Sequence, residues 1–175
     1  HQPAHSRTHS TKGSNVKFSD IYQVIKTHIL AGDTRTVFQI DGEPGSAKSA
    51  LAKALGKDPD LRFDYFDDLN FAQLDIPDVG GLALLSDTSS DVLQFKKSPL
   101  LAPFQTGRNL LCIEEVADSP IAMQNMIRRL VWDRRVNNLS LSPETFIVMC
   151  SNRSIDKSGA GRLSSKLKNA VSRIT

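Results

Sequence analysis

The chain has 175 residues, of which 39% are hydrophobic and 23% charged, and its formal net charge is +3. This length is typical of one domain that buries a real core, and the composition is that of an ordinary soluble globular protein. No apolar run approaches the roughly 18 residues that a membrane-spanning helix needs, and the mild positive charge does not establish nucleic-acid binding. Composition alone leaves the function open.

The first 14 residues, HQPAHSRTHSTKGS, are polar and contain three of the four histidines. They lack the apolar segment of a signal peptide. A metal-binding tail is one interpretation, but we favour a disordered leader or tag remnant. The folded domain is therefore expected to cover residues 15–175.

Cys112 and Cys150 are the only cysteines, and both lie inside apolar runs. Their spacing suits neither a zinc site nor a disulfide framework. We predict buried, reduced thiols that pack as small hydrophobic groups, as in a cytoplasmic protein.

The first predicted helix is SDIYQVIKTHILAG, with Ser19 as its N-cap and Gly32 as its C-terminal stop. TVFQID then predicts a short buried strand, GEPGSAKS a loop, and SALAKALG a helix of strong helix formers. This order is the start of a βαβ unit. The apolar residues of the first helix share one face: Ile21, Val24, Ile25 and Ile29.

The middle of the chain carries weaker signals. RFDYFDDL suggests a second strand, whereas Pro77 and the Gly80–Gly81 pair break regular structure in FAQLDIPDVGGLALL. The segment SDTSSDVLQFKKSPLLAPFQTG predicts a short hairpin or helix before a loop near Pro99 and Pro103.

Two further apolar strands, NLLCIEEV and TFIVMCSN, flank the predicted helix SPIAMQNMIRRLVWDRR. Ser119 is its expected cap, and Pro120 suits its first turn. Apolar strands separated by helices indicate an α/β fold with a parallel sheet covered on both faces. The helical rhythm is carried by Ile121, Met123, Met126, Ile127, Leu130 and Val131.

The loop GEPGSAKS favours a phosphate site, because backbone N–H groups at a helix N-terminus suit a triphosphate. Lys48 can reach the β- and γ-phosphates, and the Ser49 hydroxyl can ligate Mg²⁺. The strict motif has Gly before the Lys, so Ala47 requires a loop without positive φ there. A turn followed by a helix with an ordinary lysine is the alternative. The predicted nucleotide-binding residues are Gly42, Glu43, Pro44, Gly45, Ser46, Ala47, Lys48, Ser49 and Ala50.

Two adjacent carboxylates end the run LLCIEE. In P-loop ATPases, an apolar strand next to the phosphate-loop strand delivers an acid to the magnesium shell, and a second acid can orient or deprotonate the attacking water. Successive strand side chains point to opposite faces, but at a strand end the chain turns and both can approach the site. We assign Glu114 to the magnesium shell, through water, and Glu115 to the nucleophile. A solvated strand end is the alternative.

Asn152 ends the strand TFIVMCSN. An amide at the carboxyl edge of a parallel sheet would lie near the γ-phosphate and could position the water. Alone, Asn152 would be read as a turn residue. Lys48, Glu115 and Asn152 in this order, after three apolar strands, together favour nucleotide hydrolysis.

From about Val37 to Thr175 the chain resembles the AAA+ superfamily and, within it, the MoxR-like branch. GEPGSAKSAL is similar to its Walker A segment, LLCIEEVADSPIAMQNMIRRL to its Walker B strand and next helix, and WDRRVNNLSLSPETFIVMCSNR to a hairpin and the sensor 1 strand. DIPDVGGL resembles the approach to the helix-2 insertion, and GAGRLSSKLKNAVSRIT the end of the large α/β subdomain.

The resemblance implies a P-loop three-layer sandwich with a central parallel sheet, the AAA+ core. It also implies ATP and Mg²⁺ as ligands. The subunits would form a ring, usually a hexamer, with ATP bound between neighbours. Hydrolysis would remodel a protein client, as in chaperones.

Two residues depart from the family pattern. Glu114 replaces the usual Asp, and Ala170 stands where an Arg finger for the neighbouring subunit is expected. Such a finger contributes roughly 10³–10⁵ in rate in other P-loop enzymes. Arg162 and Arg173 are candidate replacements, with solvated surface arginines as the alternative. The chain also ends where the helical lid would begin, which is consistent with a fragment, a disordered lid or none.

Three functions remain open on this basis. The first is an ATPase that remodels a protein partner, with Phe95, Lys96 and Lys97 as candidate contacts, although a core Phe beside surface charges is preferred there. The second is a nucleotide-regulated interaction module with little hydrolysis, which Ala170 favours. The third is a nucleic-acid-acting ATPase, suggested by the basic residues Arg128, Arg129, Arg134 and Arg135.

Overall fold

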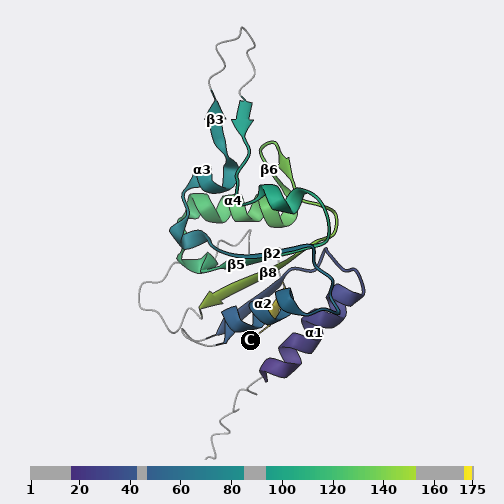
Figure 1. Cartoon of the computed structure of the whole chain (residues 1–175). Helices are drawn as coiled ribbons and strands as arrows, with labels where there is room; N and C mark the ends of the chain where they lie inside the picture. The colour runs from purple at the N-terminus through teal and green to yellow at the C-terminus, as the bar shows by residue number, and fades with distance from the viewer. Residues whose placement is uncertain (1–16, 43–46, 85–93, 153–171, 175) are drawn as a thin grey trace, which may run out of the picture.

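The computed structural model describes residues 17–42, 47–84, 94–152 and 172–174 (Figure 1). Within these ranges, five strands form a central sheet in the order β2-β5-β8-β1-β9. Every neighbouring pair in this sheet is parallel. The strands are β1 (Phe38–Gly42), β2 (Tyr65–Asn70), β5 (Asn109–Glu114), β8 (Thr145–Asn152) and β9 (Ser172–Ile174).

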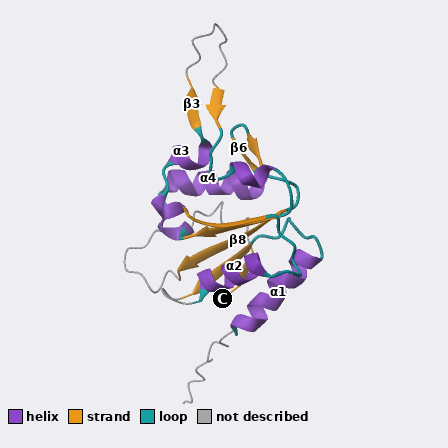
Figure 2. Ribbon diagram, viewed as in Figure 1, coloured by secondary structure: helices purple, strands orange, loops and turns teal. Residues whose placement is uncertain are grey.

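Helices cover both faces of this sheet (Figure 2). On one face lie α1 (Phe18–Leu30) and α2 (Lys48–Lys57), and on the other α3 (Ile76–Gly80) and α4 (Ile121–Trp132). Side chains alternate between the two layers, so β5 gives Leu110 to the α1–α2 core and Leu111 to the α4 core. The expected three-layer α/β sandwich is therefore confirmed.

Shorter elements complete the α4 layer. The strands β3 (Leu82–Leu84) and β4 (Gln94–Lys96) pair antiparallel as one hairpin, and β6 (Arg135–Val136) and β7 (Leu139–Ser140) as another. The 3₁₀ helices are η1 (Phe71–Gln73), η2 (Ala102–Gln105) and η3 (Val116–Asp118). None of the helices in the described ranges is long and apolar enough to cross a membrane.

The strand order corrects one expectation. The strand that ends in the two carboxylates, β5, does not lie next to β1, because β8 lies between them. The connection through α2 carries the chain from β1 to β2 at the far edge, and β5 and β8 then fill the space between. Since β1, β5 and β8 are all buried on both faces, their sequences carry no signal for lateral order.

Two predicted helix starts were wrong. The residue before α1 is Lys17, not Ser19. Val24, predicted to lie on the apolar face of this helix, is 46% exposed. The residue before α4 is Pro120, and the Ser119 hydroxyl donates to the Glu115 carbonyl oxygen instead of capping the helix. Gly32 does follow α1, with φ +74°.

Pro77 begins a short helix rather than breaking structure. It lies in the first turn of α3, where a missing N–H costs nothing. The helix ends at Gly80, and the next residue, Gly81, adopts φ +81°. A side chain at Gly81 would collide with the Lys96 carbonyl oxygen, at 2.1 Å from its Cβ. The predicted break therefore lies at the second glycine of the pair.

Both cysteines are free and buried, as predicted. Cys112 on β5 and Cys150 on β8 approach to 3.8 Å between their sulfur atoms. The hydrogen bond with Cys150, together with burial, raises the pKa of the Cys112 thiol well above its usual range. The Cys112 thiol is thus held in its unreactive, protonated form.

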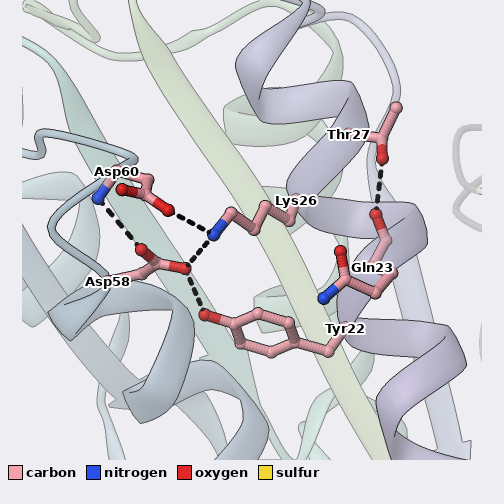
Figure 3. A network of polar contacts seen from close by, with 6 residues as sticks. All are labelled: Tyr22, Gln23, Lys26, Thr27, Asp58 and Asp60. Carbon is pink, nitrogen blue, oxygen red and sulfur yellow. Dashed lines mark hydrogen bonds and ion pairs between the residues drawn. The ribbon is translucent and has the colours of Figure 1, made fainter.

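A polar network fastens α1 to the end of α2 (Figure 3). The Tyr22 hydroxyl donates to Asp58 Oδ2 at 2.5 Å, and Lys26 Nζ lies 2.9 Å from the same oxygen and 2.8 Å from Asp60 Oδ2. These hydrogen bonds, Tyr22 first and then Lys26, lower the pKa of Asp58 to about 2. Burial, followed by the bond to Asp58, raises the pKa of Tyr22 to about 12.

The Asp58 carboxylate therefore makes stability depend on pH. Its folded-state pKa of about 2 lies below the ordinary value of about 4, so its contribution is complete above about pH 4 and is lost as pH falls toward 2. Urea denaturation of the wild type and of Asp58→Asn across this range should show a steeper loss of stability in the wild type. Equal slopes would contradict the assignment.

Candidate nucleotide-binding site at the carboxyl edge of the sheet

Three predicted site segments meet at the carboxyl edge of the sheet. Gly42 at the end of β1 pairs in register with Asn152 at the end of β8, and β5 ends beside β8 at Glu114. The loop residues Glu43, Pro44, Gly45 and Ser46 lie outside the described residues. The chain is described again from Ala47, immediately before α2.

The start of α2 agrees with the predicted phosphate loop. Ala47 has φ −72°, so the position needs no glycine, as the sequence required. Lys48 and Ser49 are half-buried in the first turn, and Ala50 is exposed. The positive end of the α2 dipole therefore faces the edge where β1 ends.

One amide connects the predicted lysine to the predicted base. Lys48 Nζ donates to Asn152 Oδ1 and to the Gly42 carbonyl oxygen, each at 3.2 Å. Asn152 Nδ2 donates in turn to Glu115 Oε2 at 3.3 Å and to Oε1 at 3.5 Å. The structure thus brings together the three residues to which the sequence assigned catalytic roles.

Glu115 reaches Asn152 because the backbone turns sharply after β5. Its φ of +58° and ψ of +33° are left-handed values, which cost a non-glycine residue about 1–3 kcal/mol. The turn is held by Asp118 N and by the Ser119 hydroxyl, which both donate to the Glu115 carbonyl oxygen. The expected turn at the strand end is therefore present.

Ser151 also holds this turn, and sequence reasoning missed it. Its buried hydroxyl accepts a hydrogen bond from Ala117 N at 3.3 Å, which joins the end of β8 to η3. A second missed group lies opposite in register: Asp41 is buried and accepts from Gln39 Nε2 at 2.7 Å. The sequence signal that could have identified Ser151 and Asp41 is a polar residue inside an otherwise apolar strand.

The residues present fit a magnesium–nucleotide complex. Glu114 Oε1 is buried and has no hydrogen-bond partner among the described residues, an arrangement that a nearby cation or its water would relieve. The described ranges contain no cluster of three His, Cys, Asp or Glu side chains that could cage a metal.

The four arginines do not form one exposed patch. Arg134 donates to the Thr145 carbonyl oxygen at 2.7 Å, and burial lowers its pKa. Arg128 is half-buried, with its Nε atom enclosed, whereas Arg129 and Arg135 are exposed. Arg134 is therefore part of the fold rather than of a nucleic-acid surface.

The candidate partner residues lie on the β3–β4 hairpin and just after it. Phe95 is only half-buried and belongs to neither core, so the preferred interpretation of a core Phe was wrong. Lys96 and Lys97 are exposed. The possible finger residue Arg162 and Ala170 lie outside the described residues, and Arg173 lies in β9, where only the backbone is described.

Comparisons with known proteins bear on the fold alone. No protein-family model and no curated protein matches the sequence. Among solved structures, a presumed ATPase from Cytophaga hutchinsonii superposes with a TM-score of 0.56 at 18% identity, over 87% of this chain and 46% of that one. What the two chains share is the fold, a three-layer α/β sandwich around a central parallel sheet.

Two variants of RuvB from Thermotoga maritima match similarly. Their TM-scores are 0.55 and 0.56 at 15% identity, over 87% and 89% of this chain. They are covered over 41% and 44% of their own length, so this chain spans less than half of each of the three solved structures.

The Ser151 contact generates a prediction about stability. Ser151→Ala leaves Ala117 N without its acceptor and should lower the free energy of unfolding by about 1 kcal/mol. Urea denaturation measures this loss, with the exposed Ser140→Ala as the matched control. An unchanged midpoint in Ser151→Ala would show that the contact does not hold the turn.

Proposed function

We propose that the chain is a magnesium-dependent ATP-binding and ATP-hydrolysing module of the MoxR-like AAA+ type. The observation that carries this proposal is the connection of Lys48 to Glu115 through the Asn152 amide at the carboxyl edge of the sheet. A protein that only bound nucleotide would not need a carboxylate and an amide held together beside its phosphate loop.

Lys48 is the group that exchanges partners when nucleotide binds. Its bonds to Gly42 and Asn152 are 3.2 Å long and go to neutral oxygens, whereas charge-assisted bonds from ammonium groups to anions are usually 2.7–2.9 Å. Phosphate oxygens would therefore compete well for Lys48. Residues 42–50 would supply backbone donors at the positive end of the α2 dipole.

Ser49 and Glu114 are the residues that would hold Mg²⁺, Glu114 through a water molecule. The ion, when bound, neutralises charge on the β- and γ-phosphates. Glu114 Oε1, buried and unpaired within the described ranges, supports this role.

Glu115 and Asn152 would act on the attacking water. When Lys48 turns to phosphate, Asn152 Oδ1 loses its cationic partner and becomes an acceptor for a water proton, while Nδ2 still holds the carboxylate. Glu115 then orients the water and takes its proton. The left-handed backbone at Glu115 keeps the carboxylate in this position.

We further propose that the module works in a ring, a hexamer by resemblance, in which hydrolysis remodels a protein client in the cytoplasm. An Arg for the γ-phosphate would come from Arg162, Arg173 or another subunit, because Ala170 occupies the family position. A nucleotide-regulated assembly module with little hydrolysis is the second candidate, favoured by Ala170.

Steady-state ATP hydrolysis, measured with magnesium across a series of protein concentrations, tests the proposal. Glu115→Gln should retain nucleotide binding and lose about 10²–10⁴-fold in turnover, because it removes the base and keeps the shape. Lys48→Ala should lose binding as well. Glu144→Gln is the matched control and should behave as the wild type. Glu144 is exposed and directly precedes β8, at the end of the strand opposite to Asn152.

Each outcome distinguishes the candidates. Turnover that rises with protein concentration indicates a ring and an Arg supplied between subunits. Binding without turnover at any concentration favours the assembly module. If the wild type binds no nucleotide, the central proposal fails.

A further inference from the structure

The outward face of α4 (Ile121–Trp132) ends in the only tryptophan of the chain. Trp132 is 61% exposed, although tryptophan is highly buried on average. The opposite face of the helix packs into the core through Met123, Ile127 and Leu130. Trp132 contributes to neither core, so its indole is open to a binding partner.

Three arginines lie close to Trp132 along the chain. Residues three and four positions apart are neighbours on a helix surface, so Arg129 and Arg128 lie next to Trp132. Arg135 begins β6 and is exposed, as Arg129 is, whereas Arg128 is half-buried. Among the described residues, no ion pair joins these three arginines to an acidic side chain. We call Arg128, Arg129, Trp132 and Arg135 the Trp132 surface.

Positive charge at this end of α4 outweighs the acidic side chains. Residues 121–140 contain four arginines and one acidic residue, Asp133. Arg134 is held by a backbone carbonyl oxygen and by the charge of Asp33, so it does not add to the surface. Three arginines therefore remain against Asp133 and Glu144, which is exposed next to the residue that Arg134 contacts.

The other acidic side chains that neighbour α4 lie toward its middle or its first turn. Gly80 of α3 packs beside Met126, about 9 Å along the helix from Trp132. The 3₁₀ helix η3 precedes the first turn of α4, at the opposite end. These acids are Asp75 and Asp78 on α3 and Asp118 on η3, while Asp87 and Asp91, between β3 and β4, lie outside the described residues.

The chemistry of the Trp132 surface suits a chain of phosphates and flat bases. Residues 116–152 contain four arginines and no lysine, although the whole chain has as many lysines as arginines. A guanidinium group binds phosphate through two parallel N–H bonds and stacks on flat rings, whereas an ammonium group is a point charge. Within the described ranges no ring or guanidinium lies over the indole, so the ring is open to base stacking.

Other kinds of partner fit this surface less well. Two copies of the chain that met through it would place like charges opposite one another, because a two-fold interface pairs identical patches. An acidic peptide would satisfy the arginines but would offer no flat group to the exposed indole. Single-stranded nucleic acid satisfies both, since its bases are accessible and its backbone is anionic.

We propose that the Trp132 surface binds single-stranded nucleic acid, with a base stacked on Trp132 and phosphates bound by Arg129 and Arg135. The surface is separate from the nucleotide site, because Arg134 contacts the first residue of β8 and Asn152 is the last. The inference therefore goes beyond the proposed function, and it stands or fails independently of ATP binding.

The fluorescence of Trp132 tests the proposal without a label, because the chain has no other tryptophan. An oligothymidylate about 12 nucleotides long should quench the emission in a saturable way, and Mg–ATP should not displace it. The slope of log affinity against log salt should be about −1.4 to −2.1, which corresponds to two or three phosphate contacts. Heparin, a polyanion without bases, should leave the emission unchanged.

The anisotropy of a labelled oligothymidylate measures binding by the variants. Trp132→Ala should weaken binding at least about tenfold because one base stack is lost, whereas Trp132→Phe keeps a ring and should retain most of the affinity. Arg129→Gln should weaken binding and make the salt slope shallower by about 0.7. Arg62→Gln, at an exposed arginine beside the α1–α2 core, is the matched control and should bind as the wild type.

Absence of quenching by oligothymidylate, or unchanged binding in Trp132→Ala, would overturn the proposal. Polyglutamate that binds as tightly as oligothymidylate would refute it and identify an acidic protein segment as the occupant. Self-association of the wild type in sedimentation, abolished by Trp132→Ala, would refute it in favour of a second copy. Circular dichroism checks the folding of each variant, and if Trp132→Ala unfolds, unchanged affinity and salt slope in Arg129→Gln would be decisive against the proposal. ATP binding by the same proteins, measured separately, reports on the nucleotide site alone.

Discussion

The site depends on a single neutral amide placed between a cation and an anion. Asn152 offers an acceptor to Lys48 and donors to Glu115, and no other uncharged side chain of this size presents both kinds of group in one plane. A charged residue there would pair permanently with one neighbour and repel the other. The ends of β1, β8 and β5 must therefore lie side by side, which the strand order provides.

The gathering of polar groups at this edge follows from how the sheet is buried. Its central strands are apolar on both faces, so polar side chains are tolerated mainly where the strands end and the chain leaves the core. The sharp turn at Glu115 completes the arrangement by bringing a second carboxylate to the same edge. Ser151, Ser119 and Asp118 stabilise the turn from the neighbouring elements.

The sequence predicted the individual strands better than their order in the sheet. Runs of apolar residues located β1, β5 and β8, and the polar residues at the strand ends predicted the candidate site. Lateral order was not predictable, because strands buried on both faces look alike. The cap at Ser119 was mispredicted since its hydroxyl bonds the turn at Glu115 instead. The β3–β4 hairpin was predicted only as an ambiguous segment, because residues outside its strands contact it: Asn138 donates to the Phe95 carbonyl oxygen, and Gly81 admits the Lys96 carbonyl oxygen.

The two buried cysteines can report local unfolding at the centre of the sheet. They lie on β5 and β8, the neighbouring interior strands that carry the acid and the amide, and both are buried. A thiol reagent can reach them only when β5 and β8 separate from their covering helices. The rate of thiol modification in the native protein therefore measures how often the centre of the sheet opens, and no cysteine has to be introduced.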